Sequence, residues 1–296
     1  MTDQGARLRS LLAEQSPVVA PGTFNALFAR LIVEAGFPAV YLSGAGVANT
    51  LLGQPDLGIV TMNEMLLVAE HVCAAVDVPV VADGDTGYGG VHNVARTVAA
   101  YERAGVAAIQ LEDQVFPKKC GHFEGKEVVP VGEMLERIHA AREARSGPDG
   151  ILIIARTDAA GPIGLDEAIE RARLYGEAGA DVLFVEAPRS HEELARIGRE
   201  LAEWPLMANM VEYGKTPLLP ADELGALGFS LVIFPGSITR TATFAAREIL
   251  EELAAAGTTA GRLDKMASFQ DVNSVVGLED ANEWEQAISD RSSDRS

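Results

Sequence analysis

The sequence predicts an α/β protein with the (β/α)8 architecture of the TIM barrel. Short apolar runs alternate with longer helix-periodic segments, and eight such pairs follow one another along the chain. The short runs are apolar throughout rather than at every second residue, as in strands that are buried on both faces. Eight units in about 250 residues is the usual size of this barrel. An open doubly wound sheet is the alternative, but no G-x-G-x-x-G follows the first predicted strand.

The predicted strands are rich in Val, Ile, Leu and Ala, and each is followed by a helical pattern. The strands cover residues 18–20, 39–42, 78–82, 107–111, 151–155, 181–185, 206–208 and 230–234. The helices cover residues 23–35, 62–76, 93–104, 132–144, 165–178, 190–201, 221–227 and 239–256. The residues expected to cap helix N-termini are Thr61, Asp166 and Ser190. The residues expected to end helices in the left-handed conformation are Gly36, Gly105, Gly179 and Gly228.

We expect residues 1–296 to form a single barrel domain. Two further helical patterns, at residues 263–276 and 278–289, lie beyond the eight units. The barrel does not need these helices, so the C-terminal helical segment, residues 239–290, is expected to pack on a neighbouring subunit and to take part in oligomerisation.

The composition argues against several classes of function. The chain has 43 acidic and 24 basic residues and a net charge of −19, which disfavours nucleic acid and anionic membranes as partners. No uncharged apolar run reaches the ~18 residues of a membrane span, and the first residues lack a signal-peptide pattern. The two cysteines make no disulfide framework, which fits a reducing, cytoplasmic compartment, and Cys73 is expected in the core.

Polar or charged side chains stand at the carboxyl end of nearly every predicted strand, where a TIM barrel has its active site. Asp83, Asp85 and Glu112 follow adjacent strands, and clustered carboxylate oxygens suit Mg²⁺. Taken alone, the Asp83-Gly-Asp85 sequence also fits an ordinary acidic turn. The lack of a paired Cys/His set argues against zinc.

Other side chains in these turns are candidates for binding carboxylates of a small anion. Arg156 is suited to a bidentate contact with a carboxylate, or to an ion pair with Asp158 or Glu186. Ser43, Gly44 and Ala45 offer a hydroxyl and backbone N–H groups, and Asn209 offers an amide. The guanidinium of Arg240 could bind a further carboxylate, but it fits a solvent-exposed residue in the first turn of a helix equally well.

The run Pro117-Lys-Lys-Cys-Gly-His122 places a thiol, an imidazole and two ammonium groups within six residues. Nearby cations lower the pKa of a thiol, so Cys120 is a candidate proton donor or nucleophile. Gly121 allows the backbone to approach a ligand closely. Together with a Mg²⁺ site and several anion-binding groups, this loop predicts chemistry on a di- or tricarboxylate or an α-keto acid.

These residues resemble a known family. Eight stretches are similar to those of the isocitrate lyase/phosphoenolpyruvate mutase superfamily, and the likeness covers roughly residues 15–290. The Cys-containing loop is similar to that of the carbon–carbon lyase branch. The resemblance implies a (β/α)8 barrel whose eighth helix is exchanged between subunits, usually in a homotetramer. The stretches are Tyr41-Leu-Ser-Gly44, Leu52-Gly-Gln-Pro-Asp-Leu-Gly58, Asp83-Gly-Asp-Thr-Gly87, Leu111-Glu-Asp-Gln114, Lys118-Lys-Cys-Gly-His122, Ala155-Arg-Thr-Asp158, Phe184-Val-Glu186 and Ala208-Asn209.

The resemblance also implies roles for individual residues. Asp83 and Asp85 would hold Mg²⁺, with Mn²⁺ as a substitute, while Glu112 and Asp56 would reach the ion through water. The implied substrate contacts are Ser43, Gly44, Ala45, Cys120, Gly121, Arg156, Glu186 and Asn209, with Arg240 at a third carboxylate. The implied catalytic residues are Cys120 as the proton donor, with Lys118, His122, Tyr41 and Glu186.

The implied reaction is a retro-Claisen cleavage of a 2-hydroxy acid. The chain length is closer to that of 2-methylisocitrate and 2,3-dimethylmalate lyases than to that of isocitrate lyases, and Arg240 favours 2-methylisocitrate, which would give pyruvate and succinate. Gly84 and Lys119 look more like the subgroup of alkylmalate lyases, such as 2,3-dimethylmalate lyase, and oxaloacetate hydrolases. An oxaloacetate hydrolase or decarboxylase is the alternative from another reaction class, and Pro235 argues against it. A non-enzymatic scaffold is a third hypothesis, against which the complete set of metal and loop residues argues.

Overall fold

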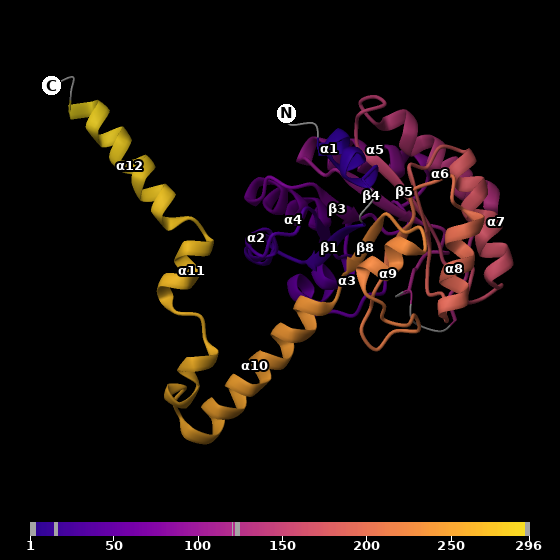
Figure 1. Ribbon diagram of the computed structural model, residues 1–296. Coiled ribbons are helices and arrows are strands. Elements are labelled where there is room, and N and C mark those ends of the chain that lie inside the picture. The colour runs from indigo at the N-terminus through magenta and orange to yellow at the C-terminus, as the bar shows by residue number, and fades with distance from the viewer. Residues whose placement is uncertain (1–3, 15–16, 120, 122–124, 294–296) are drawn as a thin grey trace. The chain divides into compact units, whose positions relative to one another are not determined.

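The computed structural model describes residues 4–14, 17–119, 121 and 125–293. Its eight strands are all parallel and are hydrogen-bonded in the order β6-β5-β4-β3-β2-β1-β8-β7. A parallel bridge between Leu183 and Leu206 joins β6 to the segment before β7, so the barrel is nearly closed (Figure 1). The predicted (β/α)8 fold is confirmed. The strands are β1 Val18–Thr23, β2 Val40–Leu42, β3 Val80–Asp83, β4 Ala108–Glu112, β5 Leu152–Thr157, β6 Val182–Val185, β7 Met207–Asn209 and β8 Leu231–Phe234.

The strands are buried on both faces, as their continuous apolar sequences predict. Val81, Ile154 and Phe184 belong to one buried cluster, which also contains residues of β1 and β8. Their chain neighbours, such as Ile153 and Leu183, belong to a second cluster that includes side chains of the surrounding helices. Because successive strand residues point to opposite faces, the first cluster fills the barrel and the second lies between sheet and helices.

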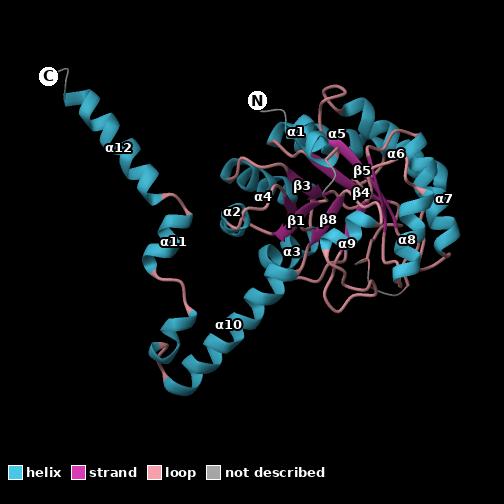
Figure 2. Ribbon diagram, viewed as in Figure 1, coloured by secondary structure: helices cyan, strands magenta, loops and turns pink. Residues whose placement is uncertain are grey.

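The helices that surround the barrel lie where the sequence predicts them (Figure 2). Thr61 and Ser190 accept hydrogen bonds from backbone N–H groups and cap α4 and α8 as expected, and the four predicted stop glycines all have positive φ. The predicted cap Asp166 is wrong: Gly164 is the N-cap, and Asp166 lies in the first turn, where a carboxylate interacts favourably with the helix dipole. These helices are α2 Ala26–Glu34, α4 Met62–Ala75, α5 Val91–Ala104, α6 Val131–Ala144, α7 Leu165–Glu177, α8 His191–Glu200 and α9 Ala221–Ala226.

Two helical segments were not expected from the sequence. Helix α1, Gln4–Leu12, lies at the amino ends of the strands, where Arg9 donates to the Gly150 carbonyl before β5 and Leu8 joins the cluster that fills the barrel. Helix α3, Gly44–Val47, follows β2 and continues into a π-helical turn, Ala48–Leu52. Helix α1 therefore closes one end of the barrel and leaves the carboxyl ends of the strands for the site.

The chain divides into two compact units, Met1–Thr239 and Arg240–Ser296. Helix α10, Ser237–Ala256, begins at the end of the first unit, and α12, Leu278–Ser293, ends the second. The prediction of one helix over residues 263–276 is wrong in its first part. A 3-10 helix, Ala260–Lys265, ends there, and α11, Phe269–Val275, begins after Ser268, which forms a capping box. The part of this segment in oligomerisation stays a prediction. Within the described residues, no helix has the length and apolar character that crossing a membrane requires.

Candidate active site

The carboxyl ends of the strands bring the predicted site residues of the barrel to one rim. Backbone register places Asp83 of β3 beside Gln110 of β4, and Glu112 of β4 beside Arg156 of β5. Glu186 follows β6 directly, and its backbone N–H donates to the carbonyl of Thr157 at 3.0 Å. The side chains that meet here are almost fully buried: Asp83, Asp85, Glu112, Arg156 and Glu186.

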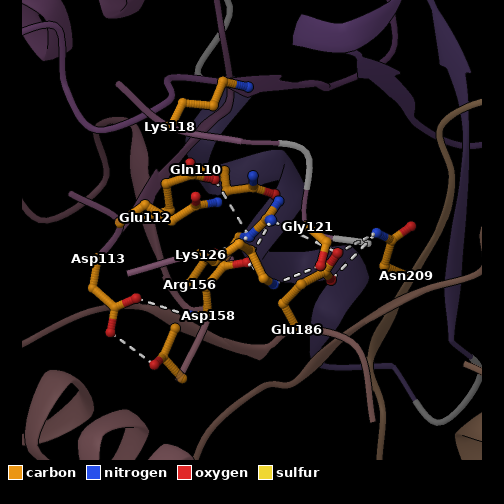
Figure 3. Close-up of polar contacts among 12 residues, drawn as sticks. Gln110, Glu112, Asp113, Lys118, Gly121, Lys126, Arg156, Asp158, Glu186 and Asn209 are labelled. Carbon is orange, nitrogen blue, oxygen red and sulfur yellow. Dashed lines mark hydrogen bonds and ion pairs between the residues drawn. The ribbon is translucent and has the colours of Figure 1, made fainter. Parts of the chain in front are cut away.

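Arg156 lies at the centre of this group (Figure 3). Its Nε and Nη2 donate to the two carboxylate oxygens of Asp158 at 2.8 and 3.0 Å. Its Nε also lies 3.4 Å from Glu112 Oε2, and its Nη2 lies 3.7 Å from Glu186 Oε1. The guanidinium carbon lies 5.3 Å from the ring centre of Phe184, within the range of a cation–π contact. The predicted ion pairs with Asp158 and Glu186 are therefore present, and they fix the direction of the guanidinium.

Glu186 and Asn209 form the neighbouring part of the rim. Asn209 Nδ2 donates to both carboxylate oxygens of Glu186 at 3.3 Å. Asn209 Oδ1 is buried and accepts no hydrogen bond from the described residues. A buried amide oxygen without a donor is costly, so this position is suited to a ligand or water that donates one.

Asp83 is held by backbone and amide donors. Its Oδ1 accepts from the Asp85 N–H at 3.0 Å and from Gln110 Nε2 at 3.4 Å. A Cβ added to Gly44 would lie 2.7 Å from Asp83 Oδ2, so only glycine lets α3 approach this carboxylate so closely. Asp85 has a φ of +46°, a left-handed conformation that Asp tolerates better than most residues.

The buried carboxylates fit a hydrated divalent cation. Burial raises the pKa of Asp85 to about 6, Lys118 opposing this change and Asp83 adding to it. Burial also raises the pKa of Glu112, and Glu112 Oε1 accepts no hydrogen bond among the described residues. Within that same part of the chain, no three His, Cys, Asp or Glu side chains are arranged to ligate one ion together. Mg²⁺ keeps several waters and needs only one or two direct carboxylates, so these donors suit it.

Lys118 connects the loop after β4 to the acidic side of the site. Its ammonium lies 2.8 Å from Asp85 Oδ1 and also donates to Asp56. Burial lowers the pKa of Lys118, but Asp85, Glu112 and other carboxylates outweigh burial and raise it well above its ordinary value. Lys118 therefore stays charged, and it brings the predicted residue Asp56 to the edge of the site.

Tyr41 belongs to the cluster that fills the barrel and lies near the acidic side chains of the rim. Its hydroxyl donates to Gln110 Oε1 at 3.2 Å. Burial and the charge of Asp83 raise the pKa of Tyr41 well above 10. A phenol with such a pKa keeps its proton at neutral pH, which favours a donating role over that of a base.

Gly121 brings the loop after β4 against the pair formed by Arg156 and Glu186. A Cβ on Gly121 would lie 2.1 Å from Glu186 Oε1 and 2.3 Å from Arg156 Nη2. The base of the loop is closed by an antiparallel bridge between Gln114 and Val128. Cys120 and His122, the predicted proton donor and its neighbour, lie outside the described residues, but Cys120 is covalently adjacent to Gly121.

The other predicted substrate contacts are placed less directly. The Ser43 hydroxyl caps α3 by accepting from the Gly46 N–H at 3.1 Å, and Ala45 lies in the first turn of that helix. Arg240 belongs to the second compact unit. The substrate-binding roles of these residues stay predictions.

Three buried residues of the site were not among the predicted candidates. Gln110 joins Tyr41 to Asp83 and was read only as part of an apolar strand. Asp113 accepts from Thr157 Oγ1 at 2.7 Å and from the Asp158 N–H at 2.9 Å, and thus supports the end of β5. The third is Lys126, which contacts the loop and Asp158. The acidic pair Glu112-Asp113 signalled the second of these, but no local pattern distinguishes Lys126 from a solvated lysine.

Comparison with known proteins identifies the family. Buried carboxylates around an arginine, at the carboxyl ends of the strands of a (β/α)8 barrel, indicate the active site of a TIM-barrel enzyme. The family described as phosphoenolpyruvate phosphomutase matches residues 8–254. The chain belongs to the isocitrate lyase/phosphoenolpyruvate mutase superfamily, and within it the chain is a carbon–carbon lyase.

The similar proteins span nearly the whole chain. 2,3-Dimethylmalate lyase of Eubacterium barkeri is 48% identical over 95% of this chain and 96% of its own, and 2-methylisocitrate lyase of Aeropyrum pernix is 43% identical over 96% and 91%. A solved oxaloacetate acetylhydrolase in complex with 3,3-difluorooxalacetate has a TM-score of 0.92 at 40% identity, covering 97% and 98%. A phosphonopyruvate hydrolase in complex with oxalate and Mg²⁺ has a TM-score of 0.87 at 30% identity, covering 97% and 99%.

Proposed function

We propose that this chain cleaves a 2-hydroxy acid with two or three carboxylates, either 2-methylisocitrate or an alkylmalate such as 2,3-dimethylmalate, and releases pyruvate. The observation that carries the proposal is the close approach of Gly121 to the pair formed by Arg156 and Glu186. It brings the loop with Cys120 directly to a buried site that combines a guanidinium with carboxylates. The names of the two similar lyases support the same reaction.

A divalent cation, Mg²⁺ or Mn²⁺, would be held by Asp83 and Asp85, with Glu112 and Asp56 hydrogen-bonded to its water. When bound, it would polarise the 2-hydroxyl and carboxylate oxygens of the substrate. The raised pKa of Asp85 supports this role, because a nearby cation offsets the burial that disfavours its charged form. The Mg²⁺ in the solved phosphonopyruvate hydrolase supports the choice of metal.

The protein's own side chains would bind the substrate and move its protons. Arg156 would bind a carboxylate, since Asp158 fixes the direction of its guanidinium. Glu186, oriented by Asn209, would accept the proton of the 2-hydroxyl group. The carbonyl then forms as the C2–C3 bond breaks, and the electron pair goes to C3. Cys120 would give its proton to C3, with Lys118 and His122 stabilising the negative charge of the departing acid.

A substrate panel tests this proposal. The purified protein with Mg²⁺ is incubated separately with 2-methylisocitrate and 2,3-dimethylmalate, and pyruvate is measured with lactate dehydrogenase. We expect pyruvate from at least one of them, with succinate or propionate as the second product, and a Cys120→Ala variant should lose most turnover. The absence of pyruvate from both substrates would contradict the proposal.

Oxaloacetate hydrolysis is the second candidate. The structural likeness to oxaloacetate acetylhydrolase favours it. Pro235 disfavours it, because the family resemblance implies a hydroxyl residue at that position in relatives that hydrolyse oxaloacetate. Incubation with oxaloacetate separates the two proposals, since hydrolysis yields oxalate and acetate without pyruvate.

We further propose that the chain forms a homotetramer in the cytoplasm through its C-terminal segment. Phe269 and Trp284 in this segment are 88% and 69% exposed, and Phe244, Leu250 and Leu263 are exposed as well. So many exposed large apolar side chains in one segment favour an interaction surface over scattered single residues. Light scattering should give a tetramer for the wild type and a smaller species for Phe269→Ser with Trp284→Ser. An unchanged mass for this double variant would contradict the proposed interface.

A further inference from the structure

Lys126 is a buried lysine for which the proposed reaction has no use. It lies in the loop that begins beyond β4, two residues before Val128, and its side chain is 3% exposed. Its ammonium donates to the carbonyl of Gly121 and, at 2.6 Å, to Asp158 Oδ1 (Figure 3). A lysine that is buried to this degree needs compensating partners, and these two contacts supply them.

The two partners of Lys126 belong to different parts of the site. Gly121 is the loop residue that lies against Arg156 and Glu186, whereas Asp158 holds Arg156 through two hydrogen bonds. Burial would raise the pKa of Asp158, but the charges of Arg156 and Lys126 lower it to about 2. Asp158 therefore stays ionised at neutral pH and binds both cations at once.

We propose that Lys126 is a positioning residue that holds the Gly121 peptide in register with Arg156. The ammonium joins the loop backbone to the carboxylate that orients the guanidinium. Hydrogen bonds thereby connect Gly121, which follows Cys120, through Lys126 and Asp158 to Arg156, which would bind the substrate carboxylate. This role rests on the proposed function, because it assigns Lys126 the task of aligning the proton donor with the bound substrate.

The test compares Lys126→Met with a matched control, Lys119→Met. Lys119 belongs to the same loop, and its ammonium donates to the Gly125 carbonyl at 2.7 Å, but its side chain is exposed and its hydrogen bonds do not involve Asp158. Hydrogen–deuterium exchange of residues 118–127 is measured without substrate. One charge-assisted hydrogen bond corresponds to about tenfold in exchange, so we expect that increase for Lys126→Met and less than about twofold for the control.

Kinetics supply the readout that a purely structural role would not move. With the substrate that releases pyruvate, kcat of Lys126→Met should fall about tenfold while KM changes less than about threefold, since one charged hydrogen bond aligns the donor. Lys126→Arg, which keeps the charge and the N–H donors, should restore most of kcat. If Lys126→Met does not fold, Lys126→Gln replaces it in both measurements.

Exchange in Lys126→Met, or in the Lys126→Gln that replaces it, within about twofold of the wild type would overturn the inference. A wild-type protein that releases no pyruvate would contradict the proposed function alone, because the exchange experiment needs no substrate. Equal loss of kcat in Lys126→Met and Lys126→Arg, despite wild-type exchange in the latter, would also overturn the positioning role.

Discussion

The substitution Gly121→Ala tests whether the loop backbone must lie against the pair formed by Arg156 and Glu186. The added Cβ would lie 2.1 Å from Glu186 Oε1, well inside the 3.4 Å at which ordinary van der Waals contact begins. Either the loop moves by about 1 Å, or Glu186 turns away from Asn209. A displacement of about 1 Å in a catalytic arrangement costs about 100-fold in rate, so kcat/KM should fall by that factor, or ~2.7 kcal/mol.

The assay is pyruvate release with lactate dehydrogenase, accompanied by a thermal melt of each variant. Gly132→Ala is the matched control, since its Cβ would meet no atom within 4 Å in α6. The control should keep full activity and gain up to about 1 kcal/mol in unfolding free energy from helix propensity. Activity of Gly121→Ala within about threefold of the wild type would refute the reasoning, because it would mean that the active state does not keep this close contact.

Four further outcomes follow from the site. Gly44→Ala would place a Cβ 2.7 Å from Asp83 Oδ2, so the Mg²⁺ concentration for half-maximal activity should rise about tenfold, the scale of a disturbed group beside a metal ligand. Asp113→Asn would weaken the charged hydrogen bond from Arg171, which keeps its contact with Glu167, and urea titration should show a loss of about 1.5–3 kcal/mol. EDTA should abolish pyruvate release, and Mg²⁺ or Mn²⁺ should restore it. The pKa of Asp158 is about 2 when folded and 3.8 when unfolded, so its ionisation stabilises the fold by about 2 kcal/mol above pH 4, and acid titration of Asp158→Asn should lack this loss between pH 4 and 2.

The barrel could be predicted because its strands and helices carry local patterns. Continuous apolar runs mark strands buried on both faces, and the glycines after α2 and α5, Gly36 and Gly105, end those helices in the left-handed conformation that the sequence predicts. Helix α1 has no such pattern, because its two buried leucines find partners only in the assembled barrel. The start of α11 was misplaced for a related reason: its boundary depends on a capping box at Ser268, whereas the apolar periodicity continues past it.

The candidate site could be predicted at the level of residue types and strand ends, but not at the level of contacts. Glu112 and Arg156 follow neighbouring strands, so their meeting at one rim follows from the fold. The ion pair of Arg156 with Asp158 could be expected from the sequence, but sequence spacing could not reveal that Lys126 binds the same carboxylate. Such contacts depend on how the loop after β4 folds back on the barrel, and no periodic pattern records that path.

The balance of charge at the rim gives a physical reason why a metal and an anionic substrate would bind together. The buried cations Lys118, Lys126 and Arg156 of this rim are each already paired with carboxylates. A substrate with two or three carboxylates would add further negative charge to a region where burial already raises the pKa values of Asp85 and Glu112. A divalent cation offsets that charge and provides the oxygen-binding centre that the lysines, each held by its own carboxylate, cannot supply. The affinity for substrate should therefore depend on the cation more strongly than on any single lysine.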